Sequence, residues 1–503
     1  MTQVGAAPAV DKRRRFAVNT GASWAANIGK TLVQLVILPV MARLLGPSDF
    51  GLYALALPTV TFALVLADGG LGASLAREDE SQTTLWSTAF WFLLGLCSLI
   101  ALAVIGVGFI LAHVSGKPEL AGLIALLSLC LIMVSLAALP GARLARRSNL
   151  IYHSVGDLAG ACLGAVVGIG MAFAGAGAWS LAGQFLTAFA VRVTVLNIGA
   201  FVRPTLVFDL RSLRGHFSTG GALVTCNAIA LSGRSAENLL FGHVFGASSL
   251  GVFTLAQQIV RFVCEAATGP VWTSLYMYGL RESPAATAAL HARLMRLLSA
   301  LVFPFVCLLA AVAPGLFALA LGPKWVDAAP MLRILAPFYA LSTTAELCGA
   351  VLVSQGRNTI LIWNVGGLTL ARVLLIQFGA GLGETGVAFG LGILAVAYTL
   401  SLFAALNLAL KPGVGFWNLL GEILPPALSA LAAGAACHAL AVRLPQTIPG
   451  FALALIGGGL VYLVFIALLQ GRKLKGDLAV LFKVLPIGAV VRRFRSPEYA
   501  SEK

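Results

Sequence analysis

The sequence predicts an all-α integral membrane protein with about 14 transmembrane helices, in which two parallel six-helix repeats are followed by two further helices. Three observations support this fold class. The 503 residues are 59% hydrophobic and only 11% charged, with a mean hydropathy of +0.93, whereas soluble domains carry about 25% charged residues. Apolar runs of about 20 residues, long enough to span a bilayer, recur along the chain. One short motif also occurs twice.

Glycine, proline and clusters of charged residues separate the apolar runs, and these breaks define the boundaries of the predicted helices. They are 17–43, 51–76, 85–112, 120–140, 153–174, 177–201, 218–243, 249–279, 294–314, 328–353, 359–379, 385–410, 418–440 and 449–470. The division of 153–201 into two helices depends on the turn signal Gly175-Ala176-Gly177. The first apolar run, which begins at Phe16, is too long for a cleaved signal peptide, so we predict a retained helix.

The distribution of lysine and arginine predicts the orientation of the chain. Most basic residues in the predicted loops fall on the side of the N-terminus, so both termini are expected in the cytoplasm. The net charge of +15 is explained by this topology and not by nucleic-acid binding, because no soluble stretch is long enough to present a basic face. The predicted outer loops are too short for a folded extracytoplasmic domain.

The repeated motif is GPSDFGLYALA at 46–56 and GASSLGVFTLA at 246–256. An ungapped alignment of Thr20–Arg77 with Gly220–Met277 has 14 identities in 58 positions, which include the pairs Gly46/Gly246, Gly51/Gly251 and Asn27/Asn227. Six predicted helices separate the copies, so the repeats enter the membrane in the same direction. Each copy is predicted to form a tight outer hinge, in which the glycines supply backbone freedom.

The repeat defines a predicted division of the chain. Its parts are a basic cytoplasmic tail at 1–15, an N-terminal lobe at 16–205, a cytoplasmic linker at 206–217, a C-terminal lobe at 218–412, two extra helices at 413–470 and a basic amphipathic cytoplasmic tail at 471–503. Two lobes that face each other leave a cleft at mid-membrane depth. This is the plan of an alternating-access transporter.

Several segments resemble a known family. They are ARLLGPSDFGLYALA (42–56), ADGGLGASLAR (67–77), LPGARLARRSNLIYHSVGD (139–157), GAGAWSLAGQ (175–184), LGPKWVDAAPMLRIL (321–335) and SQGRNTILI (354–362). On these segments the chain is similar to the multidrug/oligosaccharidyl-lipid/polysaccharide exporter superfamily, and within it to polysaccharide-biosynthesis flippases that move lipid-linked oligosaccharides. The resemblance implies two six-helix bundles, two extra C-terminal helices in many members, and a cationic central cavity.

Four basic residues lie deep in predicted helices: Lys30, Arg234, Arg261 and Arg372. An ionisable residue at this depth costs about 2.5–3.5 kcal/mol on insertion scales, so it needs a partner, water or a function. We predict that these cations line the cavity and bind the diphosphate of the cargo. The alternative is local neutralisation, because Glu237 and Glu265 follow two of the arginines at i,i+3 and i,i+4 spacing.

Other polar residues have two interpretations each. Lys30 has no acidic residue on its own helix, so it either serves the cavity or pairs with Asp68 on the next helix. Asn27 and Asn227 either bind sugars or bridge helices. Asp68, Glu237 and Glu265 are candidates for a gate or for proton coupling. Arg43 is expected to cap its own helix or contact lipid headgroups, and an interfacial aromatic belt explains Trp86, Trp179, Trp325 and Trp417.

The predicted function is a flippase that moves a polyprenyl-diphosphate-linked oligosaccharide, such as an exopolysaccharide or O-antigen repeat unit, from the cytoplasmic to the periplasmic leaflet of a bacterial inner membrane. The alternatives are a multidrug or peptidoglycan-precursor exporter and, on weaker grounds, a glycan polymerase or ligase. We expect no enzyme activity, no cofactor and no metal site, because the cysteines lie singly in apolar runs and no ATP-binding motif is present. The expected driving forces are the membrane potential and a proton or sodium gradient. The expected partners are the lipid-linked oligosaccharide, the bilayer and polysaccharide polymerase or export machinery.

Overall fold

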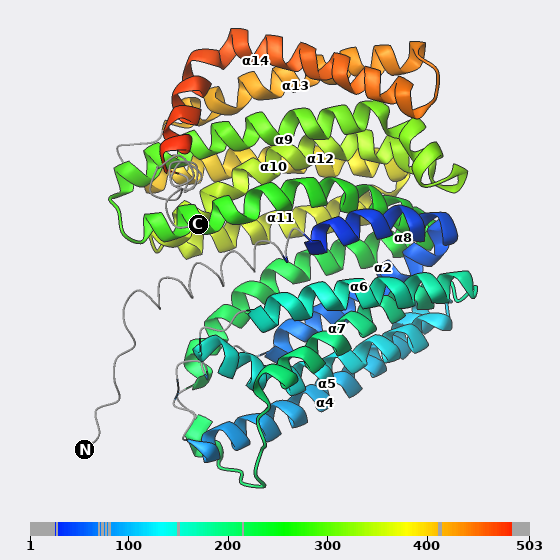
Figure 1. Ribbon diagram of the computed structural model, residues 1–503, viewed down its shortest axis with the longest axis vertical. Coiled ribbons are helices and arrows are strands. Elements are labelled where there is room, and N and C mark those ends of the chain that lie inside the picture. The colour runs from blue at the N-terminus through cyan, green and yellow to red at the C-terminus, as the bar shows by residue number, and fades with distance from the viewer. Residues whose placement is uncertain are drawn as a thin grey trace, which may run out of the picture. The chain divides into compact units, whose positions relative to one another are not determined.

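The computed structural model describes residues 26–484, except for 27–28, 69–70, 72–74, 76–77, 79–81, 148–150, 214–215 and 411–414. The described residues are almost entirely helical and contain no strand. Their long helices (Figure 1) are α2 (Pro47–Asp68), α4 (Thr83–Ser115), α5 (Glu119–Arg146), α6 (Ile151–Phe173), α7 (Ala178–Ala200), α8 (His216–Gly279), α9 (Pro284–Ala320), α10 (Ala328–Ser354), α11 (Asn358–Phe378), α12 (Gly383–Ala409), α13 (Phe416–Arg443) and α14 (Ile448–Val484). Short 3₁₀ turns are η1 (Leu210–Leu213), η2 (Pro323–Trp325) and η3 (Ala380–Leu382).

Twelve of the described helices are long and apolar enough to cross a membrane, which confirms the predicted fold class. The number 14 stays a prediction, because residues 17–25 and 27–28 of the predicted first helix lie outside the described residues and its continuous described part is 29–44. The turn between α6 and α7 falls at the predicted glycines, and Gly175 and Gly177 both have positive φ. Other boundaries differ: α9 begins ten residues before the predicted 294, and α14 continues beyond the predicted 470.

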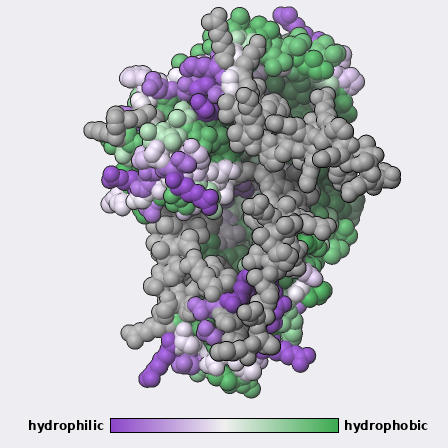
Figure 2. All heavy atoms as spheres, turned by 60° about the vertical axis from the view of Figure 1, so that its left-hand side comes forward, coloured by the Kyte–Doolittle hydropathy of each residue, from purple (hydrophilic) through white to green (hydrophobic). Residues whose placement is uncertain are grey.

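The exposed surface of these helices suits a lipid environment. Large apolar side chains point outward along α4, α6 and α9, among them Leu102, Phe109, Val166 and Leu301, each more than 60% exposed. In the view of Figure 2, hydrophobic side chains cover broad areas of the described surface, while hydrophilic side chains gather in separate patches. Such exposed apolar faces are stable only against hydrocarbon. The chain is therefore a multi-span membrane protein.

The chain forms two compact units. Unit 1 comprises Met1–Leu255, Ala318–Trp325 and Thr369–Glu384, and unit 2 comprises Ala256–Phe317, Val326–Leu368 and Thr385–Lys503. The helix α8 begins in unit 1 and ends in unit 2. The predicted lobes at 16–205 and 218–412 are defined by the sequence repeat, whereas the two units are defined by their compactness in space. The lobes therefore stay a prediction.

In unit 1, a stripe of glycines brings α6 against α7. Gly156, Gly160, Gly164 and Gly168 are all buried and recur every fourth residue. At Gly160 and Gly164 an added Cβ would lie 2.6 Å from the carbonyl oxygens of Ala188 and Gln184, respectively. Small residues at this spacing let two membrane helices approach to backbone contact, where dispersion forces are strongest.

Replacing Gly160 with leucine should therefore separate α6 from α7. We expect a loss of about 1–3 kcal/mol in the stability of the detergent-solubilised protein, measured as a lower midpoint of thermal unfolding. Gly170→Leu is the matched control, because Gly170 lies on the exposed face of the same helix and an added Cβ there meets no atom within 4 Å. Equal effects of the two substitutions would show that the stripe does not hold the pair together.

In unit 2, α14 packs on α13, and both contact α9. Their shared core includes Val312, Cys437, Phe451 and Ala454. The hydroxyl of Tyr462 donates a hydrogen bond of 2.7 Å to the carbonyl oxygen of Ala300 on α9. The two extra C-terminal helices are thus integral parts of unit 2.

Candidate functional site

The first copy of the repeated motif forms the N-terminus of α2. Pro47 occupies the first helical position, where its missing N–H leaves no hydrogen bond unmade. Asp49 reaches back, and its Oδ2 accepts a hydrogen bond of 2.9 Å from the backbone N–H of Gly46. An acidic side chain at this position caps the helix and complements its dipole.

The second copy interrupts α8. Gly246 has φ 88° and ψ 170°, a conformation that residues other than glycine rarely adopt, and it kinks the long helical stretch. Gly46 is not among the positive-φ glycines. The backbone freedom predicted for the hinge glycines is therefore used at Gly246. Gly46, in contrast, is the residue that precedes the capped helix α2.

The two copies contact each other within unit 1, and we name this contact the outer crossing, after the predicted outer side of the hinge (Pro47, Gly51, Ala247 and Gly251). A Cβ added at Gly51 would overlap the carbonyl group of Ala247, and one added at Gly251 would overlap that of Pro47. Pro47 and Ala247 are equivalent in the repeat, as are the two glycines. The contact is thus reciprocal, as in a two-fold interface, and it requires two residues without a Cβ.

A tryptophan joins the outer crossing from the turn between α9 and α10. Trp325 is fully buried. Its Nε1–H donates a hydrogen bond of 2.7 Å to the carbonyl oxygen of Ala42, and its ring meets Phe50 edge to face at 5.0 Å. The belt interpretation is wrong for Trp325 and also for Trp86, which is 4% exposed; Trp417, which is 76% exposed, fits it.

Arg43 extends the same contact. Its guanidinium donates hydrogen bonds to the carbonyl oxygens of Leu319 and Ala320, at the C-terminus of α9. The expectation that Arg43 caps its own helix, or contacts headgroups, is corrected by this geometry. The cation does cap a helix, as expected for the negative end of a helix dipole, but the helix lies 276 residues further along the chain.

Among the deep cations, Arg372 on α11 pairs with Glu237 on α8. The distance from Nη1 to Oε2 is 3.1 Å, and the two side chains are 26% and 7% exposed. Sequence spacing favoured Arg234 as the partner of Glu237, but the side chain of Arg234 lies outside the described residues. The Arg372–Glu237 pair was not predicted, because the two residues lie on helices far apart in the sequence.

Arg261 and Glu265 form the predicted i,i+4 pair on α8, with 3.5 Å between Nε and Oε1. Unlike the Arg372–Glu237 pair, both side chains are well exposed, at 42% and 59%. The geometry shows that they neutralise each other in part, and their exposure leaves room for a ligand. Their roles in cargo binding and in coupling stay predictions.

The other predicted site residues are only partly visible. Lys30 lies in the described helix at 29–44 and is partly exposed. Asn27 and the side chains of Asp68 and Asn227 lie outside the described residues, so the choice between a cavity role and a Lys30–Asp68 pair stays open.

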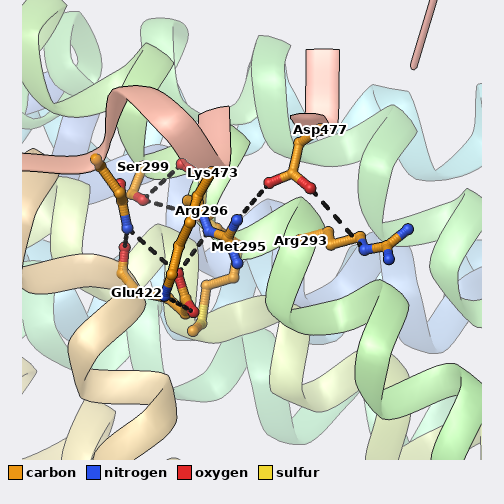
Figure 3. A network of polar contacts seen from close by, with 8 residues as sticks. Arg293, Met295, Arg296, Ser299, Glu422, Lys473 and Asp477 are labelled. Atoms are coloured by element: carbon orange, nitrogen blue, oxygen red, sulfur yellow. Dashed lines mark hydrogen bonds and ion pairs between the residues drawn. The ribbon is translucent and has the colours of Figure 1, made fainter. Parts of the chain in front are cut away.

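Unit 2 contains a charged network that sequence reasoning missed, and we name it the Arg296 cluster (Arg293, Arg296, Glu422, Lys473 and Asp477). Figure 3 shows Arg296 of α9 between Glu422 of α13 and Asp477 of α14, at 2.5 and 2.6 Å, respectively. Lys473 contacts Glu422 at 3.1 Å, and Arg293 lies 3.9 Å from Asp477. The three central side chains are only 10–12% exposed.

The cluster was missed for a specific reason. Arg296 lies at the start of the predicted helix 294–314 and Arg293 just before it, whereas Asp477 falls in the predicted tail at 471–503, because α9 starts earlier and α14 ends later than predicted. The signal in the sequence was a pair of isolated acids, Glu422 and Asp477, near the ends of apolar segments. The cluster satisfies buried charges and fastens α14 to unit 2, so its geometry indicates a structural role.

The many apolar spanning helices and the ion pairs along them define the class of protein: a multi-span helical membrane protein with charged groups on its spanning segments. The structure is similar to the lipid II flippase MurJ in an inward closed conformation, with a TM-score of 0.68 and 13% identity over 90% of this chain and 99% of that one. It is also similar to the inward-facing conformation of a multidrug resistance MATE family transporter, with a TM-score of 0.55 and 17% identity over 76% and 96%.

Residues 40–330 match the family described as polysaccharide biosynthesis protein, and the chain belongs to this family. Among curated proteins, it is 26% identical to the succinoglycan biosynthesis transport protein ExoT of Rhizobium meliloti, over 69% of this chain and 70% of that protein. It is 25% identical to the lipopolysaccharide biosynthesis protein WzxC of Escherichia coli, over 79% and 81%. The teichuronic acid biosynthesis protein TuaB of Bacillus subtilis is 22% identical, over 70% and 74%.

Proposed function

We propose that this protein is a flippase for a polyprenyl-diphosphate-linked oligosaccharide. It moves the sugar-bearing headgroup from the cytoplasmic to the periplasmic leaflet of a bacterial inner membrane by alternating access. Both termini are cytoplasmic in this proposal. The relatives are named for three different bacterial polymers, succinoglycan, lipopolysaccharide and teichuronic acid. A shared transport step for lipid-linked intermediates explains how one family serves different polymers.

The observation that carries the proposal is the exposed pair Arg261–Glu265 on a membrane-spanning helix. A guanidinium and a carboxylate with 42% and 59% of their side chains exposed are unstable against acyl chains. Their exposure supports an aqueous path beside α8. A guanidinium there suits a diphosphate, because it binds phosphate oxygens through two parallel hydrogen bonds.

The proposal includes no catalysis and no bound cofactor. The described helices are joined by short turns on the side of Gly116 and Gly175, which offers little space for a polymerase site. A diphosphate that moves outward through an inside-negative membrane gains about 2.3 kcal/mol per charge per 100 mV. We propose that this potential, with a proton or sodium gradient, drives transport, and that Glu237 and Glu265 are the candidate proton carriers. The lipid bilayer and polysaccharide polymerase or export machinery are the proposed partners.

Reconstituted vesicles test the proposal. The full-length protein would be supplied with a fluorescent polyprenyl-diphosphate oligosaccharide, and arrival of the label in the opposite leaflet would be followed with and without an imposed potential. We expect Arg261→Ala to slow transport roughly tenfold or more, since a hydrogen bond to a charged group contributes about 1.5–3 kcal/mol. Lys30→Ala should act in the same direction.

Arg281→Ala is the matched control, because Arg281 is an exposed cation just beyond the end of α8. Wild-type rates in both Arg261→Ala and Lys30→Ala would contradict the proposed role of the deep cations. Transport of an organic cation in place of the diphosphate lipid would favour a multidrug exporter. Preferential transport of a peptidoglycan precursor would favour the function named for the structural neighbour MurJ.

A further inference from the structure

The C-terminal part of α8, residues 256–279 of unit 2, has an unusual exposed face for a spanning helix. The exposed residues before the last turn are small or polar: Glu265, Ala266, Gly269, Thr273 and Ser274. On α11, by contrast, the exposed residues include Trp363, Leu370 and Phe378, which are 74%, 59% and 80% exposed. Lipid-facing helices present large apolar side chains. The exposed face of α8 is therefore suited to water, whereas that of α11 is suited to lipid.

An aromatic pair lies on the same side of α8 as the exposed ion pair. Arg261, Glu265, Trp272 and Tyr276 follow each other at intervals of four, seven and four residues, which places them in one stripe along the helix. We name these four residues the α8 stripe. The rings of Trp272 and Tyr276 are stacked, with centroids 5.5 Å apart and planes inclined by 19°. Both side chains are partly exposed.

The neighbouring helix leaves space for Trp272. Gly349 of α10 faces it, and a Cβ added there would lie 3.9 Å from the indole Nε1. The end of α8 is held to α10 nearby, because Gln355 donates a hydrogen bond of 3.1 Å to the carbonyl oxygen of Gly279. Gly269, between the ion pair and the aromatic pair, has no atom within 4 Å of an added Cβ. The stripe thus combines a supported aromatic surface with an open position beside it.

The chemistry of the α8 stripe fits a sugar better than it fits a phosphate or an acyl chain. A sugar ring presents weakly positive C–H groups on its face and hydroxyl groups at its edge. The face of an aromatic ring is negative and binds such C–H groups. A carboxylate accepts hydrogen bonds from hydroxyls, and a guanidinium donates them. A diphosphate alone would need neither the aromatic rings nor the carboxylate.

We infer that the α8 stripe is a glycan-binding surface: Trp272 and Tyr276 stack on a sugar ring, Glu265 accepts hydrogen bonds from its hydroxyl groups, and Arg261 binds the adjoining diphosphate. This inference rests on the proposed function and names the part of the cargo that these residues recognise. The competing explanation is that Trp272 and Tyr276 belong to the aromatic belt at headgroup depth. That explanation predicts lipid contact, which an experiment can detect.

The first test asks whether the face is aqueous. Thr273→Cys, in a full-length protein whose native cysteines are replaced, should react with a membrane-impermeant maleimide in vesicles. Leu370→Cys on α11 is the control and should resist labelling. A soluble oligosaccharide at millimolar concentration should slow the labelling of Thr273→Cys. Resistance of Thr273→Cys to the reagent, or labelling that the sugar leaves unchanged, would overturn the inference.

The second test separates sugar recognition from diphosphate recognition. Two probes would be compared, a polyprenyl diphosphate and the same lipid that carries one hexose. Trp272→Leu, which keeps an apolar side chain, should weaken binding of the sugar-bearing lipid roughly tenfold and leave the bare diphosphate lipid unchanged. Trp363→Leu on α11 is the matched control and should change neither.

Each remaining outcome has a distinct meaning. Equal loss for both probes, or no loss for either, would refute sugar contact by Trp272. Arg261→Ala should weaken binding of both probes under the proposed function. If the wild-type protein moved neither lipid, while soluble oligosaccharide still protected Thr273→Cys, the proposed function would fail and the glycan-binding surface would remain.

Discussion

Arg296→Ala should remove most of the folded protein from the membrane. The substitution leaves Glu422 and Asp477 buried without their central cation, and breaking a buried ion pair in this way costs about 3–5 kcal/mol. We expect low abundance in membranes, and a strongly lowered unfolding temperature for the protein that is recovered. Size-exclusion chromatography of detergent extracts after a heat series measures both quantities.

Two variants make this prediction specific to the cluster. Arg293→Ala should have a small effect, because Arg293 is 52% exposed and lies 3.9 Å from Asp477. The triple variant Arg296→Met, Glu422→Gln and Asp477→Asn should recover much of the stability, since it removes the buried charges together. If Arg296→Ala alone were as stable as the wild type, the cluster would not fasten α14 to unit 2.

Gly51→Leu should disrupt the outer crossing. Its Cβ would overlap the carbonyl group of Ala247, and no rotamer change can relieve a clash with backbone. We expect a loss of about 3 kcal/mol or more in stability, and a similar loss for Gly251→Leu, whose Cβ would overlap the carbonyl of Pro47. Because both substitutions separate the same two segments, the double variant should lose less than the sum of the two. Thermal unfolding of the purified variants measures these differences.

Gly46→Ala is the control for Gly51→Leu. An added Cβ at Gly46 meets its nearest atoms at 3.7 Å, within ordinary van der Waals contact. This variant should retain wild-type stability. Additive losses in the double variant would show that the two glycines act at independent contacts, contrary to the reciprocal geometry.

The repeated motif was partly predictable from the sequence. The offset of 200 positions identified Gly46, Gly51, Gly246 and Gly251 as a matched set. It did not predict that the copies touch, because a repeat reports common ancestry and not distance. Backbone freedom explains why position 246 is a glycine. Glycine is required at positions 51 and 251 for a different reason, because another segment of backbone approaches them closely.

The charged residues show the same limit. The Arg261–Glu265 pair was predictable, since i,i+4 neighbours on a helix must meet. The partners of Arg372 and Arg296 lie 135 and 126 residues away, and local spacing contains no information about them. The sequence places Trp325 near a helix end, which favours an interfacial position. It does not identify the neighbours, such as Phe50, that bury the side chain.

Hydropathy, glycine spacing and motif order are properties of neighbours along the chain, so they were enough to predict the fold class, the family resemblance and the turn between α6 and α7. Three other features emerge from tertiary contacts: the glycines that meet a neighbouring backbone, the arginines that are neutralised by distant acids, and the polar face of α8 that stays exposed. Those features depend on residues that are distant in sequence. The energetic effect of a charge or of a missing Cβ is set by the atoms that folding brings within a few ångströms of it.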